Sequence, residues 1–167
     1  MFGLTPLGTL HTAISLVALA AGLSALLRDG QIVAGTRSGR IYAIATLLTC
    51  LTGFGIFNHG GFGKPHVLGI VTLVVLALAW AAGRRGLFGA AAAYVEVVAF
   101  SATFFFHLIP GVTETTIRLP VGKPLFSGPD DPGLQPIAAG LFLLFLIGAT
   151  WQVLRLRRAR RGAPQPA

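Results

Sequence analysis

Residues 7–27 read LGTLHTAISLVALAAGLSALL, a run of 21 residues without a charged side chain. About 20 helical residues, at about 1.5 Å each, cross the roughly 30 Å hydrocarbon core of a bilayer. No Lys or Arg precedes this run, and it is longer than the roughly 7–15 apolar residues of a signal peptide. We therefore expect residues 7–27 to form a retained membrane-spanning helix.

Four further apolar runs follow, over residues 41–57, 66–82, 87–109 and 136–154. Pro65 and Pro136 fit the first turns of two of these helices, where a missing N–H costs nothing. We expect the fourth helix to end at Pro110. The pattern predicts an all-α fold, a polytopic membrane helix bundle of about five transmembrane helices. Residues 1–154 would form this single domain, and residues 155–167 a basic cytoplasmic tail.

The composition excludes a soluble domain, because 54% of the residues are hydrophobic, 11% are charged and the mean hydropathy is +0.77. The net charge of +8 does not indicate nucleic acid, since most basic residues flank apolar runs. Ten of the 13 lie on one side of the expected bundle: Arg28, Arg37, Arg40, Arg84, Arg85, Arg155, Arg157, Arg158, Arg160 and Arg161. The other side carries Lys64, Arg118 and Lys123. This bias predicts that the N-terminus lies outside and the C-terminus inside the cytoplasmic membrane of a bacterium.

All four histidines fall on the outer side of this topology. His11 lies early in the first helix, His66 opens the third and His107 ends the fourth, while His59 follows the second. Imidazole suits Zn, Cu and Fe, and helix bundles build metal sites from separate helices at one depth. We therefore expect a transition metal ion on His11, His66 and His107, with His59 or Glu114 as a fourth group. The alternative is that each histidine ring caps a helix end or forms a hydrogen bond with a loop carbonyl.

Glu114 is one of two candidate catalytic glutamates. It follows His107 by seven residues and lies beyond the expected helix end at Pro110. From there its carboxylate could fold back over the histidines as a ligand or a base. Its other candidate partner is Arg118, four residues further along the chain.

Glu96 is the second candidate, and we expect it near mid-membrane, where an ionised carboxylate is costly unless it is paired. Thr103 and His107 follow at seven and eleven residues, so the three side chains share one helix face. This face is either a proton path or a buried surface on which Glu96 binds a polar side chain of the second helix. The candidate partners there are Tyr42, Thr46 and Thr49.

Two stretches, GTRSGRIY at 35–42 and GGFGKPH at 60–66, resemble an uncharacterised bacterial family of small predicted membrane proteins. In that family a Gly-Arg-x-Tyr motif opens one helix and a histidine opens the next, which maps onto Gly39, Arg40, Tyr42 and His66. The family often carries a histidine just before an arginine, whereas here Thr36 precedes Arg37. The resemblance covers residues 35–82. It implies a role for His66 rather than His59, and it implies no activity.

Three hypotheses about function remain open at this stage. The first is a metalloprotein or redox protein with its metal on the outer histidines. The second is a b-type cytochrome with two histidines as axial haem ligands and a quinol as electron donor. The third is an accessory or assembly subunit of a larger membrane complex without a cofactor. A transporter is disfavoured, because the five runs show no internal repeat.

Overall fold

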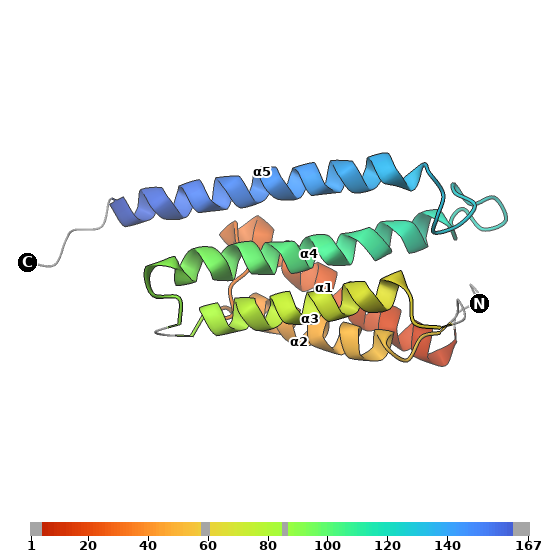
Figure 1. The fold of residues 1–167 in the computed structure, drawn as a ribbon, viewed down its shortest axis with the longest axis horizontal. Coiled ribbons are helices and arrows are strands. Elements are labelled where there is room, and N and C mark those ends of the chain that lie inside the picture. The colour runs from red at the N-terminus through yellow and green to blue at the C-terminus, as the bar shows by residue number, and fades with distance from the viewer. Residues whose placement is uncertain (1–4, 58–60, 85–86, 162–167) are drawn as a thin grey trace, which may run out of the picture.

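The computed structural model describes residues 5–57, 61–84 and 87–161, and within these ranges it is all-α, as predicted (Figure 1). It contains five α-helices and one short 3-10 helix: α1 Pro6–Asp29, α2 Arg37–Gly53, α3 Lys64–Ala82, η1 Gly89–Ala91, α4 Ala92–Thr116 and α5 Leu134–Arg161. Pro65 and Pro136 lie in the first turns of α3 and α5, which confirms their expected positions.

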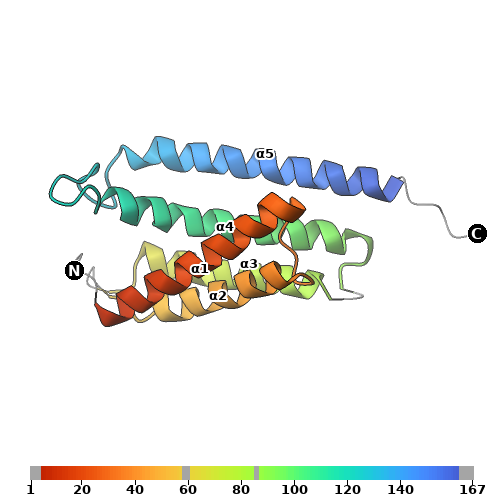
Figure 2. The same ribbon diagram turned by 180° about the vertical axis from the view of Figure 1, so that it is seen from behind.

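Successive helices run in opposite directions, so the bundle has two distinct ends (Figures 1 and 2). The N-terminal end holds the start of α1 and the α2–α3 and α4–α5 connections, and the C-terminal end holds the α1–α2 and α3–α4 connections and the end of α5. Helix α4 packs against α3 and α5, while α2 packs against α1 and α3. Helix α5 forms an outer layer on α4, and only Ala149 and Gln152 of its 28 residues are buried.

Four of the described helical segments are long and apolar enough to cross a membrane: α1, α3, α4 together with η1, and α5. Helix α2 is shorter, with 17 residues, and it carries two arginines in its first turn. The bundle surface is rich in exposed leucine, valine, isoleucine and phenylalanine. These features are typical of a multi-pass membrane protein, whose apolar surface faces lipid.

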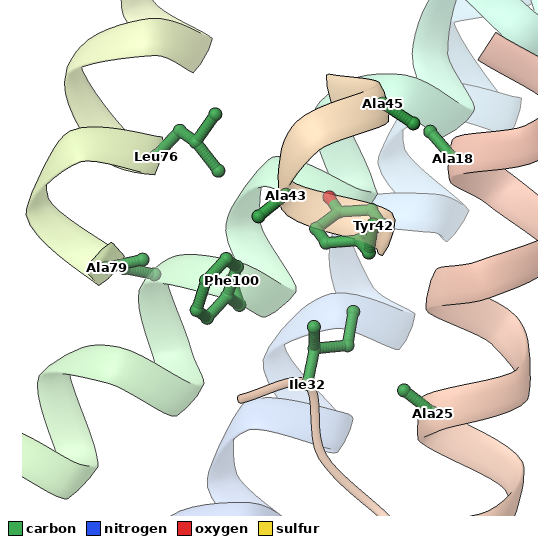
Figure 3. Close-up of a cluster of buried hydrophobic side chains, with 10 residues drawn as sticks. Ala18, Ala25, Ile32, Tyr42, Ala43, Ala45, Leu76, Ala79 and Phe100 are labelled. Carbon is green, nitrogen blue, oxygen red and sulfur yellow. The ribbon is translucent and has the colours of Figure 1, made fainter. Parts of the chain in front are cut away.

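Small residues form much of the bundle core, which Figure 3 shows. Six of its ten residues are alanines: Ala18, Ala25, Ala43, Ala45, Ala79 and Ala99. Small side chains let helix backbones approach closely, and this packing supports helix association in membranes. The fully buried rings of Tyr42 and Phe100 fill the space between α2 and α4, and they meet edge to face at 6.1 Å.

Helix α2 starts earlier and ends earlier than the predicted 41–57. The Thr36 side chain caps its first turn by accepting a hydrogen bond from the Gly39 N–H at 3.0 Å, so the helix begins at Arg37. It ends at Gly53, and the chain then turns. The prediction failed because it followed only the apolar run and passed over the capping threonine.

The prediction that Pro110 ends the fourth helix is wrong, because α4 continues to Thr116. Proline removes one backbone hydrogen bond, here the one to the carbonyl of Phe106, and α4 continues through this loss. The hydroxyls of Thr113 and Thr116 donate back to the carbonyls of Ile109 and Val112 at 2.9 and 2.8 Å, so both threonines are accommodated within the helix. The last two turns of α4 extend the face that carries His107.

The predicted start of the fourth helix at Leu87 is also wrong. Phe88 has a φ of +62°, a left-handed conformation that a helix cannot contain, and η1 precedes the first residue of α4, Ala92. At the other end of the chain, α5 continues past the predicted 154 to Arg161. Its Arg155 donates to the carbonyl of Asp29 at 2.7 Å, which places a cation at the C-terminus of α1.

Candidate functional site

One face of α2 carries four hydroxyl groups, on Tyr42, Thr46, Thr49 and Thr52. Spacings of four, three and three residues keep them on one side of a helix with about 3.6 residues per turn. Tyr42 and Thr46 are fully buried and Thr49 is 7% exposed. We call these four residues, together with Thr103, His107 and His11, the polar seam.

The deep part of the polar seam joins α2 to α4. Tyr42 Oη lies 2.7 Å from Thr103 Oγ1. The Thr103 hydroxyl already donates to the Phe100 carbonyl at 2.8 Å, so Tyr42 is the donor in the pair. One turn further, His107 Nε2 lies 3.1 Å from Thr46 Oγ1, and the ring of Tyr42 meets that of His107 edge to face. Thr103 and His107 therefore share one buried face, as predicted, and that face binds α2.

His11 joins the polar seam from α1. Its Nδ1 lies 3.1 Å from Thr52 Oγ1, and that hydroxyl donates to the Leu48 carbonyl at 2.8 Å. Because the single hydroxyl proton of Thr52 is used in this way, His11 Nδ1–H is the donor to Thr52. A neutral His11 then carries its lone pair on Nε2. Gly53 lets the ring approach α2, since a Cβ there would lie 3.2 Å from His11 Cε1.

His66 lies in the first turn of α3 and is 6% exposed. Its ring stacks between those of Phe57 and Phe62, with centroids 4.9 and 5.1 Å away. Its Nδ1 accepts the backbone N–H of Gly63 at 3.3 Å, so a neutral His66 carries its proton on Nε2. That Nε2 has no hydrogen-bond partner in the described part of the chain. The geometry favours a helix-capping role, because metal binding through Nε2 would move the proton toward the Gly63 N–H.

Glu114 lies on the same face of α4 as His107, two turns nearer the N-terminal end of the bundle. Its Oε2 is 2.7 Å from the Arg118 guanidinium, so the alternative partner named from the sequence is present. The helical continuation past Pro110 separates Glu114 from His107 by about 10 Å along the axis. The carboxylate therefore lies above the histidines instead of folding back over them.

Glu96 lies near the start of α4, at the C-terminal end of the bundle. It is the fifth residue of α4, and its Oε1 accepts the backbone N–H of Ala34 in the α1–α2 connection at 2.9 Å. The same carboxylate lies against Gly83 at the end of α3. Glu96 thus ties two connections together at the C-terminal end of the bundle and makes no hydrogen bond to Tyr42. The sequence placed Glu96 further along its helix because the helix was expected to start at Leu87, five residues before α4 begins.

The structure brings together some of the predicted site residues. His11 and His107 both contact α2, through Thr52 and Thr46, which lie six residues apart on one face of that helix. The described residues contain no group of three or more His, Cys, Asp or Glu side chains placed to hold a metal ion. His11, His66 and His107 are therefore not gathered into such a group in the described part of the chain, and His59 lies outside it.

His11 and His107, which we call the histidine pair, have the donor chemistry of a smaller site. Each ring engages an α2 threonine through one nitrogen, Nδ1 in His11 and Nε2 in His107. Metal-binding histidines are held in this way, with the second nitrogen bonded to a neighbouring polar group. Two imidazoles can occupy two coordination positions of a transition metal ion. The remaining coordination positions would need ligands from outside the histidine pair.

The role of Thr46 and Thr52 as partners of the histidine pair was not predicted from the sequence. Thr46 was expected only as a partner for Glu96, and Thr52 was not among the candidate residues. Their position on the same α2 face as Tyr42 was the available signal.

Comparisons of the chain with protein-family models, with curated proteins and with solved structures give no match. The resemblance of residues 35–82 to a family of small bacterial membrane proteins therefore stays a prediction.

Proposed function

We propose that this chain is a five-span protein of the bacterial cytoplasmic membrane, with the N-terminal end of the bundle outside. The charge distribution supports this orientation. Of the described basic residues, nine lie at or beyond the C-terminal end: Arg28, Arg37, Arg40, Arg84, Arg155, Arg157, Arg158, Arg160 and Arg161. Three lie at the N-terminal end: Lys64, Arg118 and Lys123. Helix α2 would cross with the others because it packs between α1 and α3.

Paired reporter fusions test the topology. Alkaline phosphatase fused after Arg161 should be inactive and a fluorescent protein fused there should fold, because the first needs the periplasm and the second the cytoplasm. Fusions in the α4–α5 connection, after Gly122, should give the opposite result. An active phosphatase at the C-terminus would refute the orientation.

We propose further that the protein binds a transition metal ion at its outer half through the histidine pair. The observation that carries this proposal is the hydrogen bond that holds each ring to an α2 threonine and leaves its second nitrogen for a ligand. For His11 that nitrogen is Nε2, which carries the lone pair in the neutral ring. A bound metal would supply a Lewis acid or a redox centre at the outer side, where a quinol is a candidate partner. Haem b, with the pair as axial ligands, is the alternative cofactor.

Elemental analysis and an absorption spectrum of the detergent-purified protein test this proposal. We expect a stoichiometric amount of Zn, Cu or Fe that His11→Ala and His107→Ala each abolish, whereas His66→Ala keeps it. Thr52→Val should lower the affinity about 10- to 100-fold, because it removes the group that orients His11. A strong Soret band would select haem b. Equal metal content in the wild type and the double variant His11→Ala/His107→Ala would refute binding by the pair.

An accessory subunit of a larger membrane complex is the second candidate, and the structure of α5 favours it. Only Ala149 and Gln152 of this helix are buried, so most of its apolar surface is left for lipid or another membrane protein. If the purified protein contains neither metal nor haem, this function becomes the better one. Site-specific photo-crosslinking from Leu143 and Ile147 in native membranes would then distinguish lipid from one defined protein partner.

A further inference from the structure

A cavity of about 290 Å³ lies between α4 and α5 at the N-terminal end of the bundle. Ile109 and Val112 form its α4 wall, and Leu134, Ala138 and Leu141 form its α5 wall. The spacings of three residues on α4 and of four and three on α5 keep each set on one helix face, so the two walls oppose each other. The cavity is separate from the polar seam, which lies between α1, α2 and α4.

An aromatic cluster lies next to the cavity on the same two helices. Phe105 lies one turn below Ile109 on α4, and Phe145 lies one turn below Leu141 on α5. The rings of these two phenylalanines stack with centroids 5.6 Å apart, and Phe142 lies 5.7 Å from Phe105. The cavity lining itself also includes the polar side chains of Thr113 and Gln135, so its two helix walls are mainly but not wholly apolar.

The mouth of the cavity carries both signs of charge. Lys64 Nζ lies 2.7 Å from Asp130 Oδ1, and these side chains are 90% and 82% exposed. Asp131 also lines the mouth, and it accepts the Gly133 N–H at 2.9 Å and the hydroxyl of Ser127 at 2.8 Å. The hydrogen bond from Gly133, together with those from Ser127, holds the pKa of the Asp131 carboxyl below its usual range. The mouth thus presents one ammonium group beside two carboxylates.

We propose that this cavity binds a zwitterionic phospholipid of the adjacent membrane leaflet, with the lipid phosphate on Lys64 and its ammonium group on Asp130. The upper part of an acyl chain would lie between the apolar walls. An exposed ion pair contributes little, so the Lys64–Asp130 contact can open at small cost and be replaced by two contacts to the headgroup. A volume near 300 Å³ fits a headgroup region and part of one chain, and lipid surrounds the rest.

Native mass spectrometry of the detergent-purified chain tests the proposal, with phosphatidylethanolamine and phosphatidylglycerol added separately and in competition. Phosphatidylglycerol has the phosphate without the ammonium group, so we expect phosphatidylethanolamine to bind more tightly. Lys64→Gln and Asp130→Asn should each weaken its binding about two- to fivefold, whereas Lys123→Gln, outside the cavity, should not. Equal binding of the two lipids to the wild type would overturn the proposal.

A second pair of variants tests the apolar part of the cavity. Ala138→Trp fills the space between the walls and should abolish the bound phosphatidylethanolamine. Leu143 of α5 is 58% exposed and lies outside the cavity lining, so Leu143→Trp adds the same ring elsewhere and should keep the bound lipid. If both variants retain the lipid equally, the cavity is not the site. Displacement of the lipid by a long-chain ubiquinone, with tighter binding of the quinone, would also overturn the proposal and assign the cavity to a neutral headgroup.

Discussion

The close packing at Gly22 predicts a large effect of a single methyl group. Gly22 of α1 is buried, and a Cβ at this position would lie 2.7 Å from Phe104 Cδ2 and 2.9 Å from Tyr42 Cδ2. Because both neighbours are rings, they must retreat by roughly half an ångström or more to reach van der Waals separation. Overpacking of this kind costs about 1–3 kcal/mol, so Gly22→Ala should lower the free energy of unfolding by that amount.

Gly148→Ala is the matched control for this prediction. Gly148 also lies within a helix, but a Cβ there would meet no atom within 4 Å. Its substitution should therefore leave the stability unchanged or raise it slightly, through the better helix propensity of alanine. Unfolding in lipid bicelles, followed by steric trapping, measures both variants. Equal stabilities for Gly22→Ala and Gly148→Ala would refute the close approach of α1 to α2 and α4.

Three further predictions concern the polar contacts. Thr46→Val should cost about 0.6–1.7 kcal/mol of unfolding free energy, the range for hydrogen bonds between membrane helices, and a cycle with His107→Leu should assign this loss to their contact. Thr12→Val, on an exposed face of α1, should have no such effect. Glu96→Gln keeps a carbonyl acceptor for the backbone N–H and should preserve stability in the same unfolding assay, whereas Glu96→Ala should lose about 0.5–1.5 kcal/mol. Since folding lowers the pKa of Asp131, its stabilisation of the α4–α5 connection should be complete above about pH 4 and disappear as the pH falls through the lower folded value, which NMR of the loop amides can follow.

The helices could be predicted from the sequence because an apolar run of membrane-spanning length has few alternatives. Their ends could not be predicted from apolarity alone, since local chemistry decides them. Thr36 starts α2 before its apolar run, and Phe88 with its positive φ delays α4. Helix α4 also continues through Pro110 to Thr116. The two errors at the ends of α4 displaced Glu96 and Glu114 from the positions expected for them.

The histidines show the same limit for the site. Their level along the bundle followed from helix order, but the direction in which each ring points depends on packing between helices. His11 and His107 point toward the threonines of α2, and their pairing has no local spacing in the sequence. His66 points instead into the turn that precedes its own helix, between two phenylalanines. The prediction from depth alone placed His11, His66 and His107 in one site, whereas the polar seam contains only His11 and His107.

The polar seam extends through only part of the bundle. Its extent bears on the end of the bundle from which a proton or ligand can reach the histidine pair. Seven residues, about 10 Å of helix, separate Thr103 from Glu96. The layer between them contains Phe100 and Ile32, which are fully buried and labelled in Figure 3, and also Val97, which is 1% exposed. None of these side chains can donate or accept a hydrogen bond, whereas proton transfer needs a chain of such groups. A proton path from Glu96 to the histidines, one of the two interpretations of this helix face, would find no hydrogen-bonding side chain among these three residues. We therefore expect a proton or ligand to reach the histidine pair from the N-terminal end of the bundle, the side on which we place the periplasm.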